Sequence, residues 1–316
     1  MCNSYSVVMM CTPDTIKGLK NNLKYIKEYL NPNSIVIVAN KKVKNIINKE
    51  SWDIQFIDED KLYPNMSLQL IKETISLKSD DLSAVKRAGW YFQQFLKMAY
   101  CTVCDDEAYL IWDSDTVPTH FVEFYSKSGK KIFDIKTEYN EIYFDTMNRL
   151  FPMLKKKNNY SFISEHMLID KRIMLELITS IEQNNNIEGN TFWKKIINAI
   201  EVEHLRGSGF SEFETFGTYV EYFHKDKYEI RKWESLREGT IFYGQGINES
   251  TLGYLSQKYD AISFEQHDMH IKLQKLFSHR VFQNLFMINI FQLIKRFLKW
   301  TLFQVSKICN SKSRLS

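Results

Sequence analysis

The sequence lacks the two glycine-rich motifs that most often bind nucleotide phosphates. No G-x-G-x-x-G follows the first predicted strand, and no G-x-x-x-x-G-K-[ST] occurs anywhere in the 316 residues. Because the glycines of these motifs let a backbone approach phosphate groups closely, their absence argues against a nicotinamide-dependent enzyme and against a P-loop nucleotide hydrolase.

Cysteine is scarce, with five residues: Cys2, Cys11, Cys101, Cys104 and Cys309. Cys101 and Cys104 form a single C-x-x-C spacing with no second pair and no matching histidines, so we do not expect a zinc or redox site. An odd number of scattered cysteines indicates a reducing compartment, the cytosol. The first apolar run is short and has no basic leader, so we expect no signal peptide.

Acidic residues are absent from residues 269–316, which contain nine Lys or Arg. The whole chain carries +4, so residues 1–268 carry −5. Bulky apolar residues alternate with the basic ones, and the longest uncharged run, 281–294, is too short to span a bilayer. We therefore expect 269–316 to be a basic amphipathic helical tail that binds an anionic membrane surface, on the inner face of the cytoplasmic membrane. The alternative is a helix packed on the protein's own core. Nucleic-acid binding is not expected, because the body is acidic.

Apolar strands alternate with amphipathic helices from the start of the chain. The pattern predicts strands at 4–11, 34–39 and 54–57, with helices at 15–30 and 42–49. Near-continuous apolar strands separated by helices are typical of parallel strands covered on both faces. Further helices are predicted at 88–98, 140–150, 171–181, 191–202, 212–223 and 252–258, and further strands at 109–112, 133–134, 226–232, 240–243 and 261–264. We expect an α/β fold with a mostly parallel central sheet flanked by helices.

Two carboxylates follow the strand 109–112. Asp113 and Asp115 are separated by one serine, and Pro118 prevents regular continuation. If the extended backbone persists to Asp115, both side chains point to the same face, at the strand end where α/β sheets bind ligands. Two hard oxygen ligands suit Mg²⁺ or Mn²⁺, which phosphate oxygens would help to coordinate. The alternative is that both aspartates only cap a turn or a helix.

Other polar residues lie where they would line the same crevice. Gln93, Gln94 and Lys97 lie on the helix that precedes the strand, and Lys97 would contact phosphate; the alternative is a solvated helix face. Glu165 and His166 lie in a predicted loop, 161–170, before a helix. A histidine in such a position is more often structural than catalytic.

Acidic residues also begin the helix 212–223. Ser211 and Glu214 fit a capping box, whereas Glu212 is not explained by capping and would stay ionised at a helix N-terminus, as a general base must. His267 follows the last predicted strand and is a candidate to complete a metal site begun by carboxylates.

Three segments occur in an order that resembles bacterial GT-A glycosyltransferases of the Asp-x-Asp type, found with surface-polysaccharide genes. They are Gly89–Lys97, Trp112–Thr116 and Ser211–Gly217, and the resemblance spans roughly residues 4–265. It implies a Rossmann-like GT-A catalytic domain over 1–268, with a nucleotide-sugar half at about 1–120 and an acceptor half at about 121–268. It also implies that a sugar is moved from a nucleoside diphosphate sugar to a glycan or lipid-linked acceptor, in the synthesis of cell-surface polysaccharide or lipopolysaccharide.

The resemblance assigns roles to the candidate residues. Asp113 and Asp115, with His267, would hold Mn²⁺ or Mg²⁺ against the diphosphate. The nucleotide sugar would contact Trp112, Ser114, Gln93, Gln94 and Lys97. Glu165 and His166 would contact the acceptor, and Glu212, with Glu214 second, would be the base of an inverting reaction. Two other interpretations are a metal-dependent nucleotidyl- or phosphotransferase and an inactive, membrane-docked glycan-binding protein.

Overall fold

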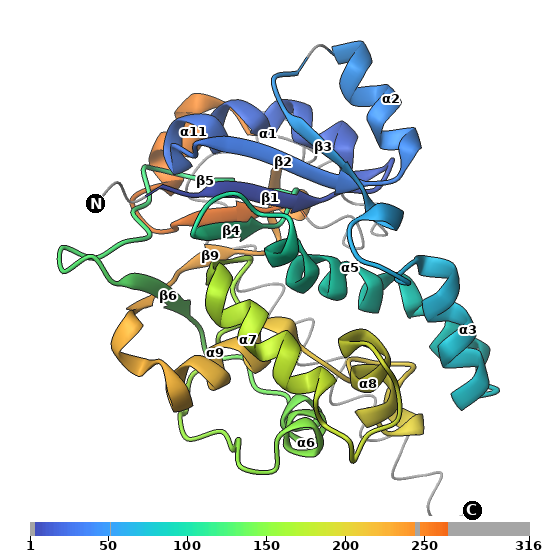
Figure 1. Ribbon diagram of the computed structural model, residues 1–316. Coiled ribbons are helices and arrows are strands. Elements are labelled where there is room, and N and C mark those ends of the chain that lie inside the picture. Colours follow the sequence, from blue (N-terminus) through green and yellow to red (C-terminus); the bar gives the residue numbers. More distant parts are fainter. Residues whose placement is uncertain (1–3, 51, 244–246, 265–316) are drawn as a thin grey trace, which may run out of the picture.

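The protein is organised around one five-stranded sheet (Figure 1). The computed structural model describes residues 4–50, 52–243 and 247–264. The strand order is β3-β2-β1-β4-β7, and the first four strands run parallel whereas β7 pairs antiparallel with β4. The strands are β1 (Ser6–Met10), β2 (Ser34–Ala39), β3 (Gln55–Asp58), β4 (Ala108–Trp112) and β7 (His166–Asp170). The predicted α/β fold with a mostly parallel central sheet is confirmed.

Helices cover both faces of this sheet, because alternate strand residues point to opposite sides. Val7 and Met9 of β1 pack into a core with α1 and α2, whereas Val8 and Met10 pack into a second core on the other face. Figure 1 shows α1 above the sheet and α5 and α7 below it. The helices of the first face are α1 (Thr15–Leu30) and α2 (Lys41–Glu50). Those of the second are α3 (Leu68–Lys78), α4 (Leu82–Lys86), α5 (Ala88–Ala99), α6 (Glu141–Leu150), α7 (Lys171–Glu182), α8 (Phe192–Ala199) and α9 (Glu212–Phe223).

Two smaller sheets extend the fold. One has the order β5-β10-β9 and the other pairs β6 with β8 in parallel. Their strands are β5 (Thr116–Pro118), β6 (Lys131–Ile135), β8 (Tyr228–Lys232), β9 (Ser235–Leu236) and β10 (Ala261–Ser263), and α11 (Glu249–Leu255) precedes β10. Because β10 pairs antiparallel with β5, the end of the described chain lies directly beside the segment that follows Asp113 and Asp115.

Two predicted elements are wrong. Residues 166–170, predicted within a loop, form β7, whose apolar residues are buried against β4. The segment predicted as a strand at 240–243 belongs instead to the short helix α10 (Gly239–Tyr243). Its β-branched and aromatic residues favour a strand, but tertiary packing overrides this preference. A Cβ on Gly239 would lie 2.6 Å from the carbonyl oxygen of Ser263, so the glycine lets α10 start against β10.

Part of the predicted organisation falls outside the described residues, namely His267 and the tail 269–316. Within the described part of the chain, no helix combines the length and the apolar character that crossing a membrane would require.

Candidate functional site

A cleft of about 550 Å³ opens at the carboxyl ends of β1 and β4. From β1 the chain builds the sheet to one side, through β2 and β3. Strand β4 then adds to the other side of β1, so the strand order reverses between β1 and β4. Ligands of α/β sheets bind at such a switch point. The cleft is lined by Met10, Thr12, Thr15, Arg87, Trp90, Gln93, Gln94, Lys97, Asp113, Ser114, Asp115, Glu138, Tyr143, Ile163, Ser164, Glu165, Ser208, Ser211, Glu212, Phe213, Arg237 and Ser263.

Asp113 and Asp115 both line this cleft, but by a turn rather than by continued strand. Strand β4 ends at Trp112, and the backbone N–H of Thr116 donates to the carbonyl of Asp113 at 3.0 Å. The indole Nε1 of Trp112 donates to the carbonyl of Thr116 at 2.9 Å, which ties the two ends of the turn together. The Asp113 N–H donates to the carbonyl of Glu165 at 2.9 Å. The predicted extended backbone is therefore wrong, although both aspartates line the same cleft.

Lys97 lies between two carboxylates from distant parts of the chain. Its Nζ is 3.1 Å from Asp113 Oδ1 and 3.1 Å from Glu212 Oε1. Burial by itself would lower the pKa of Lys97, but the charges of Asp113 and Glu212 outweigh it and the pKa is raised. Lys97 is therefore a fixed positive charge that links the Asp113–Asp115 turn to the start of α9.

Glu212 is held at the start of α9 by a second contact with α5. The Ser211 hydroxyl caps the helix by accepting from the Glu214 N–H at 3.2 Å. The backbone N–H of Glu212 donates to Gln94 Oε1 at 3.1 Å. Gln94 is 4% exposed, and its Nε2 has no hydrogen-bond partner among the described residues. Since a buried donor normally finds a partner, this amide is available to a ligand in the cleft.

Glu165 also lines the cleft. Its Oε1 accepts from Lys136 Nζ at 2.7 Å and from the Ser235 hydroxyl at 2.9 Å, while its buried Oε2 has no partner in the described chain. Burial raises the pKa of Glu165, but the ammonium of Lys136 outweighs this effect and the pKa is lowered. Glu165 is therefore an ionised carboxylate with one oxygen left for a ligand.

Three predicted site residues lie outside the cleft lining. Trp112 is fully buried behind the turn. His166 is 1% exposed, with its Nε2 2.7 Å from Asp134 Oδ2 and its ring stacked on Trp112. Glu214 accepts from the Ser161 hydroxyl at 2.5 Å and pairs with Lys156 at 2.9 Å. The side chain of Glu214 therefore completes no capping box.

Several cleft residues were not identified from the sequence. Thr12 and Thr15 follow β1, and Glu138 and Arg237 approach from later loops. Arg87, the N-cap residue of α5, is followed by Trp90, Gln94 and Lys97 of that helix at spacings of three, four and three residues. Such spacing places side chains on one helix face, opposite the apolar stripe. The sequence pattern could therefore have predicted that Arg87 and Trp90 line the cleft together with Gln94 and Lys97.

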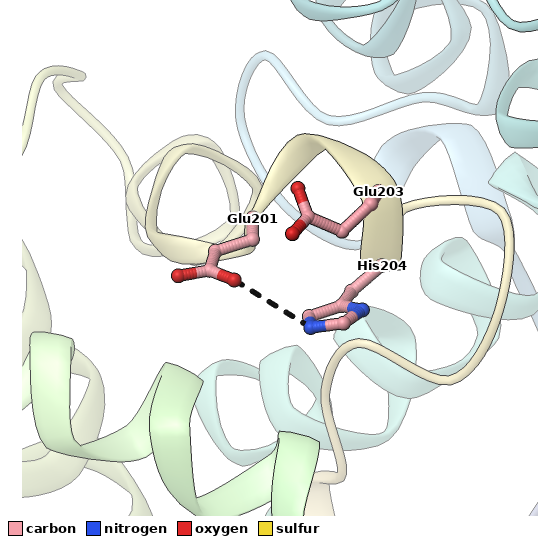
Figure 2. Close-up of side chains that lie close together, drawn as sticks. All are labelled: Glu201, Glu203 and His204. Atoms are coloured by element: carbon pink, nitrogen blue, oxygen red, sulfur yellow. Dashed lines mark ion pairs between the residues drawn. The ribbon is translucent and has the colours of Figure 1, made fainter.

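The donor set of the turn suits a hard divalent cation. Asp113 and Asp115 supply carboxylate oxygens, and Mg²⁺ or Mn²⁺ would take its remaining ligands from water and phosphate. Among the described residues, a group of three potential ligands occurs elsewhere, at Glu201, Glu203 and His204 (Figure 2). It lies outside the cleft lining, and its Glu201 also pairs with Arg149. The turn is thus the better candidate metal centre.

Solved structures similar to this chain are glycosyltransferases at low identity. Mouse xyloside xylosyltransferase 1 has a TM-score of 0.44 and 10% identity, over 84% of this chain and 99% of that one. The galactosyltransferase LgtC, solved with donor and acceptor sugar analogues, has 0.39 and 9%, over 82% and 86%. Core-mannan synthase A of Aspergillus fumigatus, in a Mn/GDP form, has 0.40 and 9%, over 72% of each chain. Likeness at this level says nothing by itself about activity.

A search of curated proteins returned no match. A family model described as "Family of unknown function (DUF6492)" matches residues 19–236.

Proposed function

We propose an activity for this chain from the geometry of its cleft, because the chain belongs to the family of unknown function DUF6492, whose model matches more than half of it. The proposed activity is that of a metal-dependent glycosyltransferase with a GT-A fold. It would move a hexose from a nucleoside diphosphate sugar to a glycan acceptor, which the basic tail suggests is lipid-linked. The pathway would be the synthesis of cell-surface polysaccharide or lipopolysaccharide.

One observation carries the proposal. The Asp113–Asp115 turn lies at the switch point of a mostly parallel sheet, with the buried ammonium of Lys97 directly beside it. Carboxylates for a cation and a fixed positive charge are the two features that a diphosphate leaving group needs. A nucleotide base would then lie toward Thr12 and Thr15 after β1, in the half of the fold formed by residues 1–120.

We assign the following roles to the residues of the cleft. Asp113 and Asp115 would hold Mn²⁺ or Mg²⁺, which, when bound, neutralises charge on the diphosphate. Lys97 orients Asp113 and adds a positive charge near the phosphates. Ser114 and Gln93, which also line the cleft, would contact the nucleotide sugar.

We assign two carboxylates of the cleft to the acceptor. Glu212, whose Oε1 lies 3.1 Å from Lys97 Nζ, is our choice for the group that takes the proton of the acceptor hydroxyl in an inverting reaction. In a retaining reaction no such base is needed, and Glu212 would only position the sugar. Glu165, with its unpartnered Oε2, would accept a hydrogen bond from an acceptor hydroxyl.

The remaining part of the proposal concerns the tail. Residues 269–316 combine nine basic residues with bulky apolar ones and contain no acid. We propose that this segment holds the enzyme on the anionic inner leaflet, where a lipid-linked acceptor would be found.

The test measures the leaving group. The purified chain is incubated with Mn²⁺ and a panel of nucleotide sugars, and free nucleoside diphosphate and pyrophosphate are measured separately. Release of nucleoside diphosphate is expected, and Asp113→Asn or Asp115→Asn should lower it by at least about a hundredfold without unfolding the protein. Asp105→Asn is the matched control, because Asp105 is exposed before β4 begins, outside the cleft lining.

Three outcomes would contradict the proposal. Full activity of either cleft variant would remove the metal role. Release of pyrophosphate would indicate nucleotidyl transfer instead. Metal-dependent binding of UDP without turnover of any sugar nucleotide would favour a glycan-binding protein.

A further inference from the structure

The cleft contains three cationic side chains, Arg87, Lys97 and Arg237, and two of them are in ion pairs with carboxylates. Lys97 contacts Asp113 and Glu212, and Arg237 lies 3.4 Å from Glu138. Among the residues that the structure describes, Arg87 is in no ion pair, although it lines the same cleft. A half-buried guanidinium without a counterion is therefore presented to whatever binds there.

Arg87 is held in one orientation by two contacts. Its Nε donates to the carbonyl of Gly207 at 3.1 Å, and its guanidinium carbon lies 4.2 Å from the centre of the Trp90 ring. Stacking on an aromatic face and one fixed hydrogen bond pre-organise a guanidinium. No hydrogen bond joins the terminal nitrogens of Arg87 to any other described residue. These two nitrogens can therefore donate side by side to a carboxylate or a phosphate.

The position of Arg87 separates it from the proposed reacting centre. Lys97 lies ten residues after Arg87, the N-cap residue of α5, which at about 1.5 Å per residue places their backbones about 15 Å apart. The buried Gln94, with its unpartnered Nε2, lies between them on the same helix face. In chain order, Arg87 would bind an anion, Gln94 would donate a hydrogen bond, and Lys97 would lie beside the phosphates.

We propose that Arg87 recognises an anionic group, a carboxylate or a phosphate, on the acceptor glycan, bound at the end of the cleft away from Asp113 and Asp115. That the anion belongs to the acceptor rests on the proposed function, whereas the anion site itself does not. Five acidic and three cationic side chains line the cleft, so with one divalent cation bound their summed charge is zero and the cleft has no net attraction for anions. A preference for acidic sugars would consequently have to come from a specific contact.

The test compares neutral and acidic sugars as ligands of the full chain with diamagnetic Mg²⁺ present. The probes are methyl glucoside and methyl galactoside, their glucuronide and galacturonide counterparts, and glucose 6-phosphate, with affinities from ligand-observed NMR titrations. At least one charged probe should bind roughly tenfold more tightly than its neutral partner, as a charge-assisted hydrogen bond allows. The uronides and the phosphate distinguish the two anion sources.

Variants assign the preference to Arg87. Arg87→Gln should abolish it, and Arg87→Lys should keep only part, because an ammonium cannot bind at two points. Arg206→Gln is the matched control: Arg206 is exposed in the adjacent loop and does not line the cleft. Binding of UDP with Mn²⁺ should be unchanged in Arg87→Gln.

Equal or absent binding of neutral and acidic probes by the wild type would overturn the inference. So would a preference that survives in Arg87→Gln, or weaker UDP binding in that variant, which would place Arg87 on the donor. The proposed function fails separately: acidic sugars bound without release of any nucleoside diphosphate would overturn glycosyl transfer and leave the anion site intact.

Discussion

Replacing Lys97 with methionine tests the central charge arrangement of the cleft. The Lys97 side chain is 9% exposed and contacts Asp113 and Glu212, whose side chains are 38% and 7% exposed. Methionine has a similar length and volume, so the packing of α5 should change little. What the substitution removes is the positive charge between the two carboxylates.

The expected loss of stability follows from this exposure. Removing one partner of a buried ion pair costs about 3–5 kcal/mol, because the other charge stays buried and unpaired. Glu212 meets that condition, whereas water can still solvate the more exposed Asp113, so we expect about 3 kcal/mol. Such a loss would lower the Tm of a 316-residue chain by roughly 5 °C. Lys86→Met, at an exposed position of α4, is the control and should stay within about 0.5 kcal/mol of the wild type.

The same variant should bind metal more tightly. Without the ammonium, the carboxylates of the cleft attract a divalent cation with less opposition, so the Kd for Mn²⁺ should fall even though the apo protein is less stable. Urea unfolding gives the stability, and calorimetric titration with Mn²⁺ gives the affinity. Wild-type stability in Lys97→Met, or an unchanged or higher Kd for Mn²⁺, would refute the charge arrangement described above.

Three further predictions concern other parts of the chain. Glu212→Gln should lower the rate by about two to four orders of magnitude if Glu212 is the base, and a near-normal rate would remove it from the mechanism. Burial raises the pKa of Asp134, but Arg231 and His166 outweigh it and the pKa is lowered. Its stabilising contribution is therefore present above about pH 4 and lost as the pH falls through the lower folded pKa, so urea unfolding of Asp134→Asn should show a shallower acid dependence; identical slopes would contradict this. Deleting residues 276–316 should release the protein from anionic liposomes in a flotation assay, and continued binding would place the membrane contact elsewhere.

Most of the fold could be predicted because its signals are local. Helix α1 spans Thr15–Leu30 and α9 spans Glu212–Phe223, as the apolar spacing and the Ser211 cap predicted. Strand β7 was missed because a short apolar run between polar residues looks the same in a loop and in a buried strand. Its assignment depends on pairing with β4, and that pairing is visible only in three dimensions.

The candidate site was predicted only in part, for a different reason. Asp113 and Asp115 could be placed at a strand end, and the acidic start of α9 was recognised. The choice between Glu212 and Glu214 depended on helix geometry, since residues two apart on a helix point to opposite sides. Glu212 lines the cleft, whereas Glu214 is turned toward Ser161 and Lys156.

By itself, the sequence determined most of the strands and helices, with β7 and α10 as exceptions, and that a pair of carboxylates follows a buried strand, because hydrophobic period and capping act between residues close in the chain. Only the tertiary structure decided which charges meet. Lys97 contacts Glu212 across more than a hundred residues, and Arg87 is left without a carboxylate in the described chain. Such pairings depend on how α5 and α9 pack on one face of the sheet, and no local pattern in the sequence encodes that packing.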